Sequence, residues 1–238
     1  MRSGLRAAVD NLYVVFGPYP LIEDVEYCTH CVDPEQVVAL HRSPLRQITA
    51  DQLGPLLFNS TTTWGDQRYL NHFLPRLLEL VVAGDMDDWS YNVFLPGRLK
   101  DLWWSGSDDE RSAIRDFAWA WWQETMSTWP SACEVGDVLD TIVGCGADVS
   151  PYLTELQGQV GEPVARQLAE LVSGLLFHAR QDNDFWREVD DWLAGPIPAN
   201  VLVAGVSATA DPDVARQLSD AYDSLALWRQ TRSAAAGR

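Results

Sequence analysis

The chain has 238 residues, of which 47% are apolar and 21% charged, and its formal net charge at pH 7 is −17. This composition excludes a disordered chain and allows a sizeable buried core. No apolar run reaches about eighteen residues, so the sequence predicts no membrane-spanning helix.

The N-terminal residues predict a helix rather than a secretory signal. Asp10 and Asn11 interrupt the apolar stretch, and no small-residue cleavage site follows it, so we expect a cytoplasmic protein. Residues 5–16 predict an amphipathic helix, in which one stripe carries Leu5, Val9, Leu12 and Phe16.

Helix-start signals recur along the chain. Asp33-Pro34-Glu35-Gln36 combines an Asp cap, a proline at the first helical position and a glutamine that can reach back to the cap. Residues 49–52 and 107–110 predict further capping boxes. Asp66 precedes a long apolar helix over residues 67–84, which Pro75 is expected to kink or restart.

The second half of the chain continues this pattern. Helices are expected over 108–129, 134–145, 150–157, 162–180, 182–195, 198–208 and 211–230. Together these signals predict an all-α fold of about ten helices in antiparallel pairs. We expect one domain over 1–230, with a division near residue 105 as the alternative, and a flexible tail over 231–238.

Two features of the second half each leave an alternative open. The motif VARQL occurs at 164–168 and again at 214–218, as the repeats of a solenoid-like (HEAT-like) packing would do, although five matched residues can also arise from helical composition. The helix over 108–129 carries apolar groups around most of its circumference, which predicts a buried central helix. The alternative is a ligand cavity lined by its indoles, as in a small-molecule sensor.

A cysteine pair in EYCTHCVDPEQ is the one candidate site. Cys28 and Cys31 have the C-x-x-C spacing of a metal site, of a redox pair, or of two thiols that lie close without a chemical role. Redox cysteines usually sit at a helix N-terminus, whereas here the helix begins near Pro34 and no βαβ pattern surrounds the pair, so a redox role is disfavoured. Four cysteines in a chain without a signal do not predict a disulfide framework.

Two histidines could complete a zinc site with this pair. His41 lies at the end of the helix that begins at Asp33, and His72 lies in the long apolar helix that should pack nearby. Thiolates and imidazoles suit Zn²⁺, and a Cys28/Cys31/His41/His72 set would form a closed, structural site. The alternative is that the cysteines carry no metal and that His72 is a hydrogen-bonded core residue.

Residues 19–80 resemble a group of uncharacterised bacterial helical proteins. The shared features are a cysteine-containing segment, an LHxxPLRxLT stretch, a TTWGD motif and HFLPRLLEL. This resemblance names no activity. It implies that the cysteine segment, His41, Trp64-Gly65-Asp66 and His72 belong to one pattern.

No catalytic signature accompanies these features. The chain has no G-x-S-x-G elbow, no P-loop and no G-x-G-x-x-G, so an enzyme is disfavoured. The negative charge disfavours binding to nucleic acid and to anionic membranes. It favours a basic protein partner, as in immunity or antitoxin-type proteins. The alternative is that the acidic residues serve solubility alone. The competing hypothesis is a metalloprotein with a functional zinc at the cysteine segment.

Overall fold

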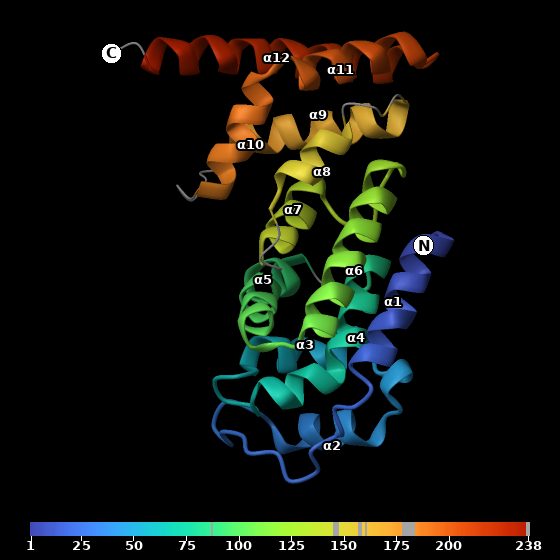
Figure 1. The fold of residues 1–238 in the computed structure, drawn as a ribbon, viewed down its shortest axis with the longest axis vertical. Helices are drawn as coiled ribbons and strands as arrows, with labels where there is room; N and C mark the ends of the chain where they lie inside the picture. Colours follow the sequence, from blue (N-terminus) through green and yellow to red (C-terminus); the bar gives the residue numbers. More distant parts are fainter. Residues whose placement is uncertain (87, 145–147, 157–158, 160, 178–183, 237–238) are drawn as a thin grey trace. The chain divides into compact units, whose positions relative to one another are not determined.

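The computed structural model describes residues 1–238 apart from 87, 145–147, 157–158, 160, 178–183 and 237–238. In 88–93, 104, 144, 175–177, 184–186 and 234–236 it describes the backbone alone. This described part contains twelve α-helices, one short 3₁₀ helix and no β-strand, so the fold is all-α, as predicted (Figure 1).

Most helices follow one another through short connections, whereas α1 and α2 are joined by the long segment 16–33. In chain order they are α1 (Ser3–Val15), α2 (Pro34–Arg42), the 3₁₀ helix η1 (Leu45–Gln47), α3 (Ala50–Asn59), α4 (Gln67–Ala83), α5 (Asp88–Ser105), α6 (Asp108–Met126), α7 (Val135–Gly144), α8 (Ser150–Glu155), α9 (Glu162–Phe177), α10 (Asp184–Ala194), α11 (Pro196–Ala208) and α12 (Pro212–Ala236).

The predicted capping boxes are present. At α2 the Asp33 side chain accepts a hydrogen bond from the helix backbone, and the Asp33 N–H donates to Gln36 Oε1 at 3.3 Å. At α6 the Ser107 N–H donates to Glu110 Oε2 at 2.6 Å, and the Glu110 N–H donates to Ser107 Oγ at 3.3 Å. Residues 49–52 form the third box at α3. These reciprocal bonds satisfy backbone donors that a helix start leaves unpaired.

The chain divides into two compact units. Unit 1 comprises Met1–Trp121 and Asp140–Ala147, and unit 2 comprises Trp122–Leu139 and Asp148–Arg238. In unit 1, α4 packs against α1, α3, α5 and η1, and α3 also packs against α2 and α5. The α4 helix has buried residues on most sides. Because its neighbours cover nearly its whole circumference, it supplies much of the unit 1 core.

Unit 2 is built around a three-helix contact in which α9, α11 and α12 each pack against the other two. The two VARQL motifs lie in the first turns of α9 and α12. Val164 and Leu168 are buried in α9, and Val214 and Leu218 are buried at the same two motif positions of α12. The echo therefore places equivalent residues in one core, while solenoid packing stays a prediction.

Some sequence expectations are confirmed and others change. The aromatic face of α6 is core, since Phe117, Trp121, Trp122 and Met126 are all at most 2% exposed. The α4 helix runs through Pro75 without a restart. The α12 helix continues to Ala236, so most of the residues of the predicted tail are helical. Within the described residues, no helix has both the length and the apolar character to cross a membrane.

Candidate functional site

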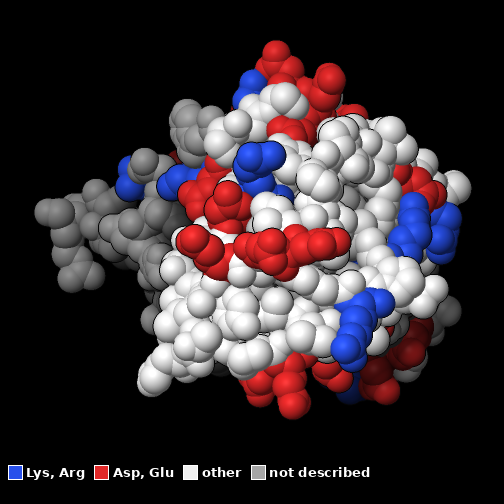
Figure 2. All heavy atoms as spheres, turned by 90° about the horizontal axis from the view of Figure 1, so that it is seen from below, with Lys and Arg blue, Asp and Glu red and all other residues white. Residues whose placement is uncertain are grey.

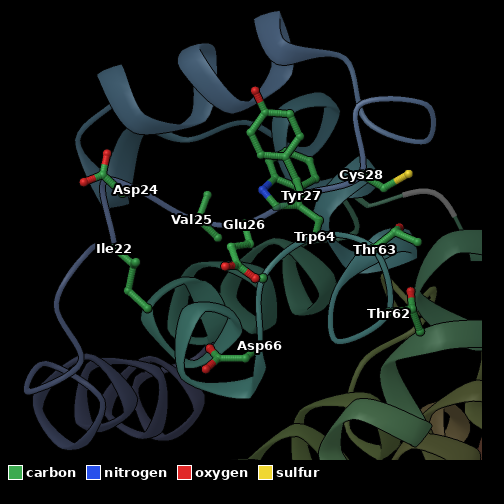
Figure 3. A pocket seen from close by; sticks show the side chains of 11 residues that line it. Ile22, Asp24, Val25, Glu26, Tyr27, Cys28, Thr62, Thr63, Trp64 and Asp66 are labelled. Atoms are coloured by element: carbon green, nitrogen blue, oxygen red, sulfur yellow. The ribbon is translucent and has the colours of Figure 1, made fainter.

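The cysteine segment lies against the turn that precedes α4. The Cys28 N–H donates to the Thr63 carbonyl at 2.8 Å, and the Gly65 N–H donates to the Glu26 carbonyl at 2.9 Å. Tyr27 and Trp64 face each other between these bonds as an isolated antiparallel bridge. Residues 26–28 and 63–65 are therefore neighbours in space (Figure 3). The two motifs that the resemblance placed in one pattern meet here.

A buried aromatic pair anchors this turn. Trp64 and Tyr69 are both 0% exposed, and their ring centroids lie 6.5 Å apart. Gly65, between Trp64 and the α4 cap Asp66, has φ of 65°. A Cβ atom at this glycine would meet the Tyr69 ring at 2.6 Å. The turn thus requires glycine both for its left-handed backbone and for space.

Carboxylates line the hollow beside this turn. A groove of about 540 Å³ is bordered by segments 22–28 and 62–66, and Asp24, Glu26 and Asp66 contribute to its wall. Figure 3 shows these side chains around the groove, with the Cys28 sulfur pointing away from them. We call segments 22–35 and 62–66 together the acidic corner.

The acidic corner contains no Lys or Arg. Residues 7–41 contain no Lys or Arg. Within this stretch, residues 22–35 carry five exposed carboxylates: Glu23, Asp24, Glu26, Asp33 and Glu35. Within the described part of the chain, none of these five forms an ion pair with Lys or Arg. Seen from the end that carries α2, Asp and Glu side chains form a row across the face, and Lys and Arg are scattered around it (Figure 2).

The two cysteines lie together in a tight turn. Cys28 and Cys31 are both exposed and free, and the N–H groups of Cys31 and Val32 each donate to the Cys28 carbonyl at 2.9 Å. The neighbouring backbone of His30, followed by the thiol and backbone of Cys31, holds the pKa of Cys28 below its ordinary value. The neighbouring Cys28 thiol raises the pKa of Cys31.

The two histidines have other partners. The hydroxyl of Tyr69 lies 2.7 Å from His41 Nε2, and the Tyr19 carbonyl lies 2.8 Å from His72 Nδ1. Burial lowers the pKa of His41, the neighbouring charge of Glu23 opposes that effect, and His72 adds to it. A neutral His41 ring that accepts a hydrogen bond from the Tyr69 hydroxyl fits this environment.

The structure therefore brings the cysteine pair together but does not gather the predicted zinc set. Among the described residues, no three His, Cys, Asp or Glu side chains lie in a position to hold one metal ion. His41 and His72 would each have to leave a hydrogen bond before reaching the thiolates. The four-ligand site stays a prediction for metal analysis to test. Of the other cysteines, Cys133 is buried, as expected for a structural thiol, and Cys145 lies outside the described residues.

Sequence reasoning missed the tyrosine contacts that hold the segment before the acidic corner. The Tyr19 hydroxyl donates to Glu110 Oε1 at 2.5 Å, across 91 residues of sequence. The backbone carbonyl of Tyr19 accepts a hydrogen bond from His72 Nδ1. No local spacing signals such contacts, because each joins residues from distant parts of the chain. The chain matches no protein-family model, no curated protein and no solved structure.

Proposed function

We propose that the chain is a non-enzymatic helical module that binds a basic protein partner through the acidic corner. The observation that carries the proposal is the concentration of exposed carboxylates on residues 22–35 without an ion pair to a described Lys or Arg. Such a surface attracts Lys and Arg side chains and accelerates encounter with a positively charged protein.

The groove supplies a place for such side chains. Asp24, Glu26 and Asp66 converge on it from two segments that backbone hydrogen bonds hold together. An arginine entering the groove could pair with a carboxylate through two parallel N–H···O bonds, which add orientation to charge attraction. An immunity or antitoxin-type role, in which an acidic protein covers a basic toxin, is one instance of this class.

A salt-dependent capture experiment tests the proposal. The immobilised full chain should retain a basic protein from a lysate of its source organism at about 50 mM salt and release it at about 500 mM, because salt screens charge attraction. The variant E23Q/D24N/E26Q should lose most of this capture. The control D213N/D220N/D223N removes the same charge from exposed positions on α12 and should retain it.

Three results would contradict the proposal. They are the absence of any partner at low salt, capture that persists at high salt, and equal loss of capture in both triple variants. The last would mean that net charge alone, rather than the acidic corner, recruits the partner.

The adjacent thiols support a second candidate, a zinc-binding protein that uses Cys28 and Cys31 with His41 and His72. This candidate requires both histidines to exchange their present partners for the metal. Metal analysis after purification without chelator tests it. A content below about 0.2 zinc per chain would remove it, since structural sites hold zinc tightly.

A further inference from the structure

The geometry of the turn over 28–32 points to an activity separate from partner binding. We propose that Cys28 and Cys31 form a reversible dithiol–disulfide site, which exchanges electrons with low-molecular-weight disulfides. This proposal does not depend on the proposed function and stands if the chain has no basic partner.

The first support is the backbone of the turn. The Cys31 N–H donates to the Cys28 carbonyl at 2.9 Å, which is the closing bond of a four-residue turn. Such a turn holds its first and last Cα atoms less than about 7 Å apart, within the range that a disulfide spans. The Cys28–Cys31 bond can therefore form without rearrangement of the neighbouring segments.

The second support is the side-chain arrangement. The turn carries both cysteines on one short segment, three residues apart, and both are free thiols. Both side chains are exposed, so a small disulfide can reach them. Cys28 Sγ points away from the groove carboxylates (Figure 3), so an anionic reagent can approach it from the opposite side.

The third support is the fixed position of the turn. On one side the Cys28 N–H is bonded to the Thr63 carbonyl, and on the other Val32 is 1% exposed and anchors the chain in the core. The sequence disfavoured a redox pair because α2 begins only at Pro34. The turn is instead held by its own backbone, since the N–H groups of Cys31 and Val32 both donate to the Cys28 carbonyl at 2.9 Å.

These contacts assign a role to each sulfur. Cys28, as the thiolate, attacks one sulfur of the reagent RSSR, so that a Cys28–S–S–R bond forms and RS⁻ leaves. Cys31 then releases its proton to solvent, and its sulfur attacks Cys28 Sγ and displaces the second RS⁻. Overall, the dithiol and RSSR give the intramolecular disulfide and two RSH, and two electrons pass from protein to reagent.

The full chain should be incubated with glutathione disulfide, quenched with an alkylating reagent and analysed by intact mass and peptide mapping. We expect loss of two hydrogens per chain, a Cys28–Cys31 cross-link and no lasting glutathione adduct on the wild type. In Cys31→Ser the adduct should accumulate on Cys28, with one reduced glutathione released per chain rather than two. Cys28→Ser should likewise stop at a mixed disulfide on Cys31, with one reduced glutathione released per chain, because no second thiol is present to complete the exchange.

Three results would overturn the proposal. In the first, both thiols remain alkylatable in excess glutathione disulfide, with or without added zinc. In the second, the wild type keeps a mixed disulfide at Cys28, which would show that Cys31 cannot reach it. Reduction with dithiothreitol should restore the starting mass, and failure to do so would exclude a reversible site. Both variants should give the same far-UV circular dichroism as the wild type, so that a folding defect is recognised separately.

Discussion

The two units hold their helices together in different ways. In unit 1, polar side chains join distant segments: the Tyr13 hydroxyl donates to Glu79 Oε2 at 2.6 Å, and Arg76 Nε donates to the Ile48 carbonyl at 2.8 Å. Unit 2 has such bonds too, for example from Arg229 Nε to the Leu193 carbonyl at 2.9 Å, but its contact of α9 with α11 depends on small residues, with Gly205 facing Ala165. A close contact between small residues leaves no room for an added methyl group, whereas a side-chain hydrogen bond can be removed without a steric clash.

The largest effect is expected where unit 2 depends on shape. A Cβ atom at Gly205 would lie 2.2 Å from the Ala165 Cβ and 3.0 Å from Leu218 Cδ1. Gly205→Ala must therefore separate α11 from α9, and we expect a loss of about 3 kcal/mol in the free energy of unfolding. Urea unfolding followed by circular dichroism measures this loss.

Two controls sharpen this prediction. Gly174→Ala in α9 adds the same methyl group where no atom lies within 4 Å, and it should be neutral or stabilise by up to about 1 kcal/mol. The exchange Ala165→Gly with Gly205→Ala moves the methyl group to the facing helix and should recover part of the loss. If Gly205→Ala alone is neutral, α9 and α11 do not pack as closely as the structure shows.

The same substitution at Gly65 tests unit 1. Gly65→Ala places a side chain at φ of 65° and against the Tyr69 ring, and we expect a loss of about 2 kcal/mol. Because the strain lies in the turn of the acidic corner, hydrogen exchange should increase at the Cys28 N–H, which is bonded to Thr63. Unchanged hydrogen exchange at the Cys28 N–H would show that strain in the turn at Gly65 does not reach the cysteine segment.

A smaller effect is expected at the polar link between α1 and α4. Burial raises the pKa of Tyr13, with a further contribution from Glu79, so the hydroxyl stays protonated and donates to that carboxylate. Tyr13→Phe removes this donor but leaves the Arg76–Glu79 pair at 2.8 Å. The expected loss is about 1–2 kcal/mol, typical of a hydrogen bond to a charged group. In a double-mutant cycle with Glu79→Gln the two losses should not add, and additivity would exclude the bond as a source of stability.

These contacts mark the limit of sequence reasoning. The caps at Asp33 and Ser107 were predictable because every partner lies within three residues. The partners of Tyr13 and Tyr19 lie 66 and 91 residues away, and periodicity carries no information about them. For the Cys28 pair, spacing supplied the residues but could not show that both lie in a turn closed by the bond from the Cys31 N–H to the Cys28 carbonyl.

The smallest effects concern pH, and the two units should respond with opposite signs. Burial holds the pKa of His41 in unit 1 below its ordinary value of 6.5, so the unfolded chain binds the proton first as the pH falls through this value. Acid should therefore destabilise the fold at His41. In unit 2, burial and the charges of Glu134 and Asp137 raise the pKa of Glu170 above its ordinary 4.5. The folded chain binds this proton first, so acid relieves a penalty that is complete at neutral pH.

Two substitutions separate these contributions. His41→Gln keeps an acceptor for the Tyr69 hydroxyl and should flatten the loss of stability between about pH 7.5 and pH 5.5. Glu170→Gln keeps an acceptor for the Val135 N–H and should stabilise the chain at pH 7.5, with the gain fading toward pH 4.5. Each change should stay below about 1 kcal/mol, because both side chains are partly exposed and solvent screens them. Urea unfolding at a series of pH values decides the signs. A Glu170→Gln variant that is less stable than the wild type at pH 7.5 would mean that the ionised carboxylate, through its bond to Val135, stabilises α7 more than burial penalises it.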